Sequence, residues 1–184
     1  MSNLTTLANA KQWLGITSPD SDSLLERLIS AASDYIQTWL NRDIALASYV
    51  SRRDGTGGTR LMLRNYPVVA MSSVVVDGQS VPFSTDGIRP GYIFNDTSVM
   101  LVGNGYRFNR GYSNVLISYT AGFSSIPTEI EQAAIELISL RYKEKDRIGI
   151  ISKGLAGETI SYTQKDFTDS IENALKNYKK VILE

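Results

Sequence analysis

Hydrophobic residues recur at helical spacing towards both ends of the chain, and as short runs or alternating positions in its middle. The helical spacing predicts helices over 5–14, 23–41, 128–146 and 167–182. Residues 47–120 form short β-rich runs separated by turn residues, with connections too short for parallel crossovers. We therefore predict an α+β fold, in which an antiparallel β-hairpin-rich sheet is inserted between helix 2 and helix 3 of a bundle of about four helices.

The sharpest helical pattern lies in 23–41. Its apolar residues return as pairs every turn: Leu24/Leu25, Leu28/Ile29, Ala31/Ala32, Tyr35/Ile36 and Trp39/Leu40. Such pairs make a stripe wide enough to be buried against neighbouring helices. Ser23 and Glu26 have the spacing of a capping box at its start. For the first helix, Thr5 or Thr6 is the expected N-cap and Gly15 the C-cap.

The stretch 114–145 predicts a strand that turns directly into a core helix. Val115, Ile117 and Tyr119 alternate with more polar positions, as in a half-buried strand. Ala121 and Gly122 end this strand. Pro127 suits the first helical turn, where its missing N–H costs nothing, and Thr128 with Glu131 also fits a capping box. This strand and this helix both need the rest of the chain to cover them.

Turn residues in the middle of the chain predict two hairpins. Asp77-Gly78, between two valine-rich runs, is a strong two-residue hairpin signal, and 95–98 reads as a second hairpin turn. The glycine-rich segment 54–59 superficially resembles a phosphate-binding loop. It lacks the terminal Lys-Ser/Thr and precedes a strand, so we interpret it as a flexible hairpin loop.

The segment 148–165 is long for a connection between two helices, which favours a functional role. Two interpretations stay open: an ordinary hairpin lying on its own domain, or an arm that orders against another subunit. On the second interpretation, its apolar residues are the candidate interface with that subunit: Ile148, Ile150, Ile151, Leu155, Ile160 and Tyr162.

Composition removes several classes of function. With 184 residues, the chain has room for one domain with a substantial core. Its 19 Lys and Arg equal its 19 Asp and Glu, so clustered positive charge gives no argument for tight binding of nucleic acid or anionic membranes. No apolar run has the length of a membrane span, and no signal-peptide pattern opens the sequence. We expect a protein made in a cytoplasm, without a membrane contact.

Candidate chemistry is sparse. There is no Cys and no His, which excludes thiol chemistry, zinc-thiolate sites and every Ser-His or Cys-His arrangement. The carboxylate pairs, such as Asp20/Asp22 and Glu129/Glu131, lie at helix starts, where capping or solvation is the default role. We predict no catalytic residue, no metal and no cofactor, and expect that the protein is not an enzyme.

The order of the motifs resembles the tailed-phage head–tail connector family, the adaptor proteins that form a ring beneath the portal of the capsid. A first helix ends near Gly15-Ile16, and the apolar-paired helix of 23–41 follows. Next comes Arg-Asn-Tyr-Pro-Val (64–68), leading into Val-Val-Val-Asp-Gly (74–78). Tyr-Thr-Ala-Gly (119–122) then precedes Ile126-Pro127 and a helix with Ala133-Ala134 and Arg141-Tyr142. The resemblance covers about residues 4–178, although 49–120 is longer than in the minimal helical members.

The resemblance implies a structural virion protein and a single connector domain over 1–184. It implies a homo-oligomeric ring of about twelve subunits that binds the phage portal protein and receives the next tail or stopper protein. DNA would pass through the ring and make only non-specific contacts. The protein would be assembled into the virion in the bacterial host cytoplasm, and 148–165 would be its assembly arm.

Two alternatives remain at this point. The first is another tail or head-completion component, such as a stopper, which the sequence separates poorly from an adaptor. The second is a carbohydrate-binding β module, because aromatic residues cluster in a Gly- and Asn-rich stretch: Tyr92, Tyr106, Phe108 and Tyr112. Aromatic residues of hairpins that pack on the core would explain the same cluster.

Overall fold

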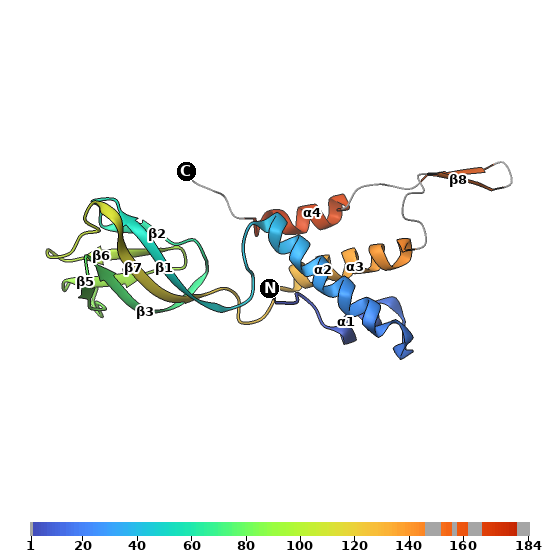
Figure 1. Ribbon diagram of the computed structural model, residues 1–184, viewed down its shortest axis with the longest axis horizontal. Helices are drawn as coiled ribbons and strands as arrows, with labels where there is room; N and C mark the ends of the chain where they lie inside the picture. Colours follow the sequence, from blue (N-terminus) through green and yellow to red (C-terminus); the bar gives the residue numbers. More distant parts are fainter. Residues whose placement is uncertain (1, 146–151, 156–157, 162–166, 180–184) are drawn as a thin grey trace. The chain divides into compact units, whose positions relative to one another are not determined.

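The computed structural model describes residues 2–145, 152–155, 158–161 and 167–179 (Figure 1). The chain divides into two compact units, which are described separately. The helical unit is formed by residues 1–43 and 126–184, and the β unit by residues 44–125. The predicted α+β class, with the sheet inserted between helix 2 and helix 3, is confirmed. That the whole chain acts as one connector domain stays a prediction.

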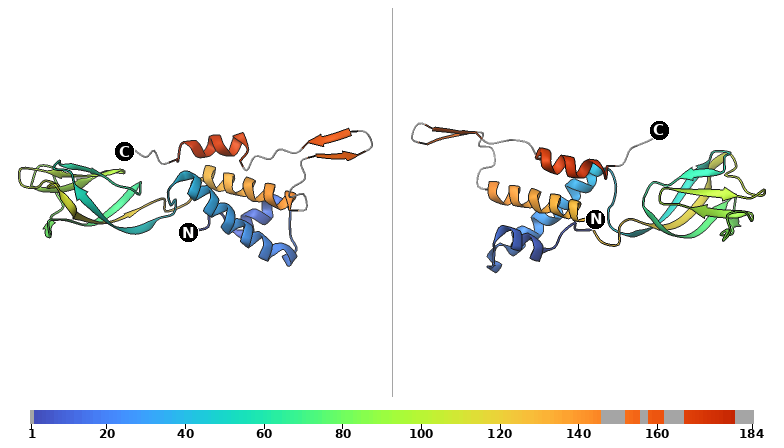
Figure 2. Two further views of the ribbon diagram at one scale, coloured as in Figure 1. Left: turned by 45° about the horizontal axis from the view of Figure 1, so that its top comes forward. Right: turned by 180° about the vertical axis from the view of Figure 1, so that it is seen from behind.

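The third helix is the centre of the helical unit. Its elements in chain order are α1 (Leu7–Leu14), the 3-10 turn η1 (Pro19–Ser21), α2 (Asp22–Leu40), α3 (Thr128–Glu144), the strands β8 (Ser152–Leu155) and β9 (Glu158–Ser161), and α4 (Asp169–Lys176). α3 contacts each of the other three α-helices, and Figure 2 shows it beside α2 and α4. Its buried residues face α1, α2 and α4 at once, which explains its wide apolar surface: Ile130, Ala133, Ala134, Ile135, Leu137 and Ile138.

Threonine residues cap the N-termini of α1 and α4. Thr6 Oγ1 accepts a hydrogen bond from the Asn9 N–H at 3.2 Å, and Gly15 ends α1 in the left-handed region at φ 69°, as predicted. Thr168 accepts a hydrogen bond from the Ile171 N–H. The last helix therefore begins at Asp169, two residues later than its apolar pattern predicts, and it ends at Lys176. Its predicted end at 182 is therefore too late, because residues 177–179 form a turn, and 180–182 lie outside the described residues.

Both predicted capping boxes are wrong. α2 starts at Asp22, because η1 leads straight into it, and Ser21 occupies the N-cap position without a side-chain cap bond. At α3, Pro127 is itself the N-cap residue and Thr128 is the first residue of the helix. No side-chain cap bond forms there, because proline has no side-chain acceptor, and the Glu131 carboxylate accepts hydrogen bonds from the N-terminal segment.

The β unit consists of two sheets. Its strands are β1 (Ala47–Gly55), β2 (Arg60–Met62), β3 (Val68–Val76), β4 (Gln79–Val81), β5 (Gly91–Phe94), β6 (Ser98–Val102) and β7 (Gly111–Ala121). One sheet has the order β1-β7-β3-β4 and the other β2-β6-β5. All pairs of named strands are antiparallel, as the short connections predict. One core joins side chains of both sheets, with Tyr119 and Phe108 as its largest fully buried side chains.

Both predicted hairpins are present, and the predicted hairpin loop at 54–59 is wrong. Asp77 and Gly78, at φ 51° and 79°, connect β3 to β4 with the positive angles that a tight hairpin turn requires. In the β5–β6 turn, Asn95 Oδ1 accepts the N–H groups of Thr97 and Ser98. β1 pairs with β7 and β2 with β6, so the glycine-rich segment crosses from one sheet to the other. Its backbone is held by hydrogen bonds between Phe108 and the glycines 57 and 58.

Candidate assembly surfaces

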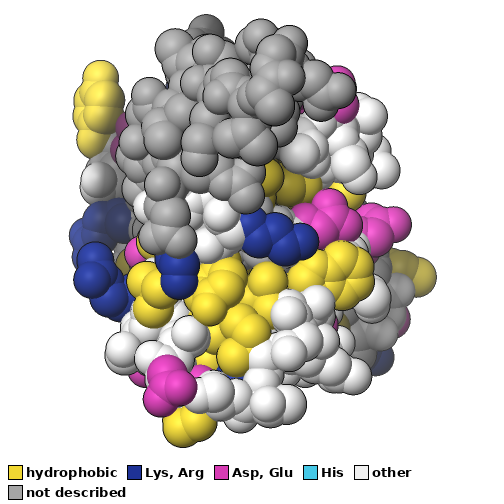
Figure 3. All heavy atoms as spheres, turned by 90° about the vertical axis from the view of Figure 1, so that its right-hand side faces the viewer, with side chains coloured by type: hydrophobic (Ala, Val, Ile, Leu, Met, Phe, Trp, Pro, Cys, Tyr) yellow, Lys and Arg dark blue, Asp and Glu magenta, His cyan; other side chains and the backbone are white. Residues whose placement is uncertain are grey.

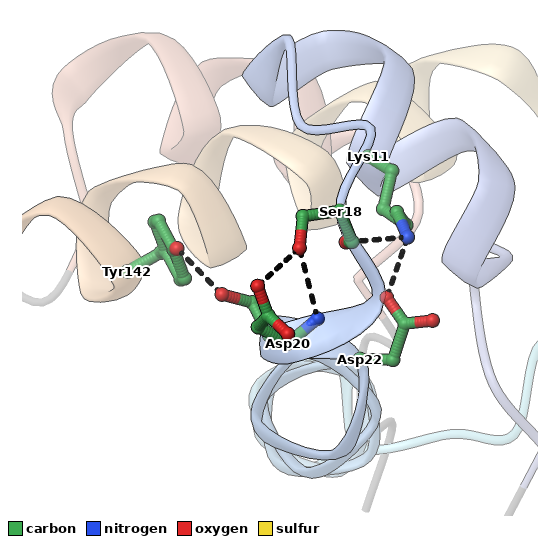
Figure 4. A network of polar contacts seen from close by, with 6 residues as sticks. Lys11, Ser18, Asp20, Asp22 and Tyr142 are labelled. Carbon is green, nitrogen blue, oxygen red and sulfur yellow. Dashed lines mark hydrogen bonds and ion pairs between the residues drawn. The ribbon is translucent and has the colours of Figure 1, made fainter.

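A polar network fixes the corner where α1 turns into α2 (Figure 4). The Lys11 ammonium donates to the Ser18 carbonyl at 2.9 Å and pairs with the Asp22 carboxylate at 2.6 Å. The Ser18 and Asp20 side chains are bonded to each other. Across the corner, the hydroxyls of Ser21 and Tyr142 lie 3.0 Å apart, which ties η1 to α3. These carboxylates are therefore structural, in line with the capping or solvated role expected from the sequence.

A second network joins the N-terminal segment to α3 and leaves a groove beside it. Glu131 Oε1 accepts the Thr5 hydroxyl at 3.1 Å and the Asn9 amide at 2.7 Å. The groove next to these contacts has a volume of about 370 Å³ and is lined by residues of α1 and the first turns of α3: Asn9, Gln12, Trp13, Thr128, Glu131, Gln132 and Ile135. Trp13 is 54% exposed, whereas tryptophan is on average a highly buried residue. Exposed tryptophan is a common anchor of protein interfaces, so this groove is a candidate contact surface.

Hydrophobic side chains also gather on the face of the molecule seen in Figure 3, with Lys and Arg side chains beside them. An apolar patch with a charged border is typical of a surface that a partner covers.

The last helix is anchored on α2 and α3 by apolar and aromatic contacts. Ile171 and Leu175 are fully buried. Phe167 packs against the rings of Tyr35 and Trp39, with centroid distances of 5.0 and 5.7 Å. Cations reinforce the same corner, because the Arg141 guanidinium lies 5.0 Å from the Tyr35 ring and the Lys179 ammonium 4.1 Å from the Trp39 ring. Burial, with Glu129 nearby, raises the pKa of the Tyr178 hydroxyl at the end of this helix.

The predicted assembly arm contains a hairpin. β8 and β9 pair antiparallel, with Ser152 opposite Ser161 and Leu155 opposite Glu158. Of the six candidate interface residues, Leu155 lies in β8 and Ile160 in β9. The remaining four lie outside the described residues: Ile148, Ile150, Ile151 and Tyr162. The assignment of these six residues to an interface stays a prediction.

The aromatic residues considered as a sugar platform do not share one exposed surface. Tyr92 and Phe108 are buried in the β core, and Tyr106 packs against it. Tyr112 is 94% exposed. Three of these four aromatic residues therefore pack in or against the β core, which is the explanation that the sequence offered as the alternative to a sugar platform.

One hollow of the β unit, about 520 Å³ in volume, is lined mainly by turn residues around Asp77 and Arg107. Side-chain hydrogen bonds from Asn114 and Asn109 lower the pKa of the Asp77 carboxyl, so its charge is already satisfied within the turns. Asp86 is similar, because backbone N–H groups of Arg89 and Ile88 lower its pKa. Such carboxylates, already hydrogen-bonded by neighbouring groups of the protein, are poorly placed to act as acids or bases.

Neither a metal centre nor a membrane helix is found in the described part of the chain. Residues 2–145, 152–155, 158–161 and 167–179 contain no group of three or more acidic side chains arranged to hold an ion. Within those same ranges, no helix combines the length and the apolar character that crossing a bilayer requires.

The fold of this chain is shared with chains of gene transfer agent particles. One similar chain is from the neck of an empty gene transfer agent (GTA) particle with C6 symmetry, with 17% identity and a TM-score of 0.58, covering 98% of this chain and 92% of that one. Another is from the virion of a native GTA particle, with 17% identity, a TM-score of 0.58 and coverages of 100% and 96%. A third, from the neck of a native GTA particle with C12 symmetry, has 15% identity, a TM-score of 0.59 and coverages of 100% and 96%. At these identities the likeness shows the fold.

The family is shown by a comparison of the sequence itself. A model of the family described as "HCP: Head completion protein" matches residues 3–181, nearly the whole chain. No curated protein matches the sequence. The chain belongs to the head completion protein family, which makes it a virion protein and confirms the resemblance to head–tail connectors at the level of the family.

Proposed function

We propose that this protein is a structural adaptor of the virion neck, which forms a ring between the portal and the tail through which DNA passes. The observation that carries the proposal is the match of the head completion family over residues 3–181. The likeness to chains of GTA necks with C6 and C12 symmetry supports a ring. On this proposal the role is structural, and no catalysis is required of a chain without His or Cys.

A closed ring needs two different surfaces on every subunit, because each copy binds its neighbour through a heterologous contact. The groove beside Trp13 is one candidate, and the hairpin β8–β9 is the other. A two-stranded hairpin on its own is marginal in water, so the hairpin gains most if a neighbouring subunit or the portal covers it. In this proposal Leu155 and Ile160 belong to that contact, together with Ile148, Ile150, Ile151 and Tyr162.

A stopper or tail-completion protein is the alternative role within the same neck. The two roles differ in the ring that the protein meets first, because an adaptor binds the portal directly and a stopper binds an adaptor. Purified portal rings that capture this protein without other neck proteins would support the adaptor role. Capture only after another neck protein has been added would assign it to the stopper position.

Deletion of residues 148–165 tests the arm. The helical core of α1, α2 and α3 does not include this segment, so the variant with a short Gly-Ser replacement should keep its helical circular dichroism and its β-unit signals. We expect that it fails to join the portal and fails to complement particles that lack the protein. Infectious particles built with the deletion variant would refute the arm assignment.

A further inference from the structure

The groove beside Trp13 contains one negative charge and no positive one. Among its lining residues, Glu131 is the single ionisable side chain. Both side-chain hydrogen bonds that Glu131 accepts end on its Oε1 atom, from Thr5 at 3.1 Å and from Asn9 at 2.7 Å. Within the described residues, no Lys or Arg lies at ion-pair distance from this carboxylate, and its Oε2 atom has no hydrogen-bond partner. The groove therefore holds a charged acceptor that the subunit itself does not use.

The same groove combines this carboxylate with apolar and amide surface. Ile135 is buried in it, and the Trp13 ring is 54% exposed. The remaining lining residues are neutral and polar: Asn9, Gln12, Thr128 and Gln132. A guanidinium suits such a lining, because it binds a carboxylate through two hydrogen bonds, stacks on an aromatic ring and is less strongly hydrated than an ammonium. The groove therefore favours an arginine that arrives with apolar surface beside it.

Arginines are unevenly distributed between the two units of the chain. The β unit, residues 44–125, contains seven Arg and four Asp, with no Lys and no Glu, which leaves a formal charge of +3. The helical unit contains 12 Lys and Arg and 15 Asp and Glu, which leaves −3. Every cation of the β unit is therefore a guanidinium. These opposite charges favour a contact between the helical unit of one copy and the β unit of another.

One arginine of the β unit lies beside exposed apolar surface. Arg52 and Val50 are two positions apart on β1, an edge strand of the four-stranded sheet, so their side chains leave the same face of that sheet. Both are exposed, Val50 to 74%. They lie opposite Leu116 and Ser118 of β7, which are uncharged. Within the described residues, Arg52 has no carboxylate at ion-pair distance.

We propose that the groove beside Trp13 binds the Val50–Arg52 face of β1 from a neighbouring copy, with the Arg52 guanidinium on the Glu131 carboxylate. The inference rests on the proposed ring, because it names the contact by which one copy holds the next. The guanidinium matches the charge of the groove, and Val50 matches its exposed indole. This contact does not involve the hairpin β8–β9, so the deletion of 148–165 tests a separate surface.

Removal of the two charges, singly and together, tests the pairing. Glu131→Gln keeps the Oε1 acceptor but removes the charge, and Arg52→Gln removes the guanidinium. Ring formation with purified portal is followed by light scattering behind a sizing column. We expect each single variant to need at least about tenfold more protein for half-assembly, and the double variant to lose no more than the weaker single variant, because the two groups act as one pair. The controls Glu26→Gln and Arg107→Gln remove exposed charges elsewhere and should stay within about twofold of wild type.

Cysteine cross-linking tests the contact even if a charge variant loses stability. The chain has no Cys, so Gln12→Cys in the groove and Val50→Cys on β1 can be made in separate proteins, which are then mixed on the portal and oxidised. A disulfide between these two proteins joins two copies and requires their Cα atoms to lie within about 7 Å. We expect this cross-link, and none between Gln12→Cys and Tyr112→Cys, whose native side chain is 94% exposed on β7. No cross-link in the first mixture, or equal yields in both, would overturn the proposal.

The outcomes separate this contact from the adaptor function. If Glu131→Gln weakens assembly and Arg52→Gln does not, the groove binds another group, such as a cation of the portal, and the assignment of β1 is overturned. A wild-type ring that both charge variants form equally well would overturn the inference alone. A wild-type protein that never forms a ring with portal would overturn the adaptor function and this inference together.

Discussion

The last helix should be separable from the rest of the helical unit by one substitution. Leu175 is fully buried in α4, and the helix has eight residues, too few to persist without its packing. Truncation of a fully buried leucine to alanine costs about 2–5 kcal/mol, through lost transfer free energy and the cavity left behind. Since about 1.4 kcal/mol is tenfold in an equilibrium constant, Leu175→Ala should favour undocking of α4 by about 30-fold to about 5000-fold.

Trp39 reports this undocking. Its ring contacts Phe167 and the Lys179 ammonium, which lie just before and just after α4, so undocking exposes it to water and shifts its fluorescence to longer wavelength. The chain has two tryptophans, and Trp13 is already 54% exposed, so its emission should change little. Hydrogen exchange should show loss of protection over 169–176 and none over the β unit.

The control is Leu46→Ala, which removes the same atoms from a side chain that is 42% exposed and should change stability by no more than about 0.5 kcal/mol. If Leu175→Ala leaves the emission and the amide protection of α4 unchanged, Leu175 does not anchor the helix. Simultaneous loss of protection in α4 and the β unit would show that the effect is not confined to α4, which contradicts the prediction.

Other substitutions test local features of each unit. Gly122→Ala should strongly lower the urea midpoint of unfolding, because Gly122 has φ 112° and an added Cβ would lie 2.4 Å from the Ala45 carbonyl oxygen. The control Gly105→Ala should be nearly neutral, because an added Cβ there has its nearest contact at 3.5 Å. Thr6→Ala should destabilise the protein by about 0.5–2 kcal/mol, measured by thermal melting, through loss of the α1 cap. Hydrogen bonds from two Asn side chains lower the pKa of Asp77, so they stabilise the folded protein at pH values above 3.8, the pKa in the unfolded chain. This stabilisation is lost as the pH falls through the lower pKa of the folded protein. Melting curves of Asp77→Asn between about pH 2 and pH 6 should therefore fall less steeply towards acid than those of wild type, and equal slopes would count against this role.

The features that sequence reasoning found are those that local chemistry decides. The Asp77-Gly78 hairpin, the Thr6 cap and the break at Gly122 each depend on backbone preferences of a few neighbouring residues. The fold class followed because helical and strand periods occupy different parts of the chain. Family membership came from the order of such local motifs.

The features that sequence reasoning missed depend on partners far apart in the chain. Thr128 and Glu131 have the spacing of a capping box, yet Glu131 is taken by Thr5 and Asn9, more than 120 residues earlier. The crossing of 54–59 between the sheets depends on which strands β1 and β2 pair with. The seven arginines of the β unit are scattered over 52–110 of a chain with zero net charge. Their excess over the four Asp of this unit becomes visible only when the structure places the unit boundaries at 43/44 and 125/126.

The measurement that tests the adaptor role most directly is the mass of the purified protein over a range of concentrations, with and without portal rings. Light scattering behind a sizing column gives this mass without a label. The account predicts a ring, formed by the protein alone or on the portal, with many copies bound per portal. A monomer at every concentration that elutes apart from the portal would contradict it.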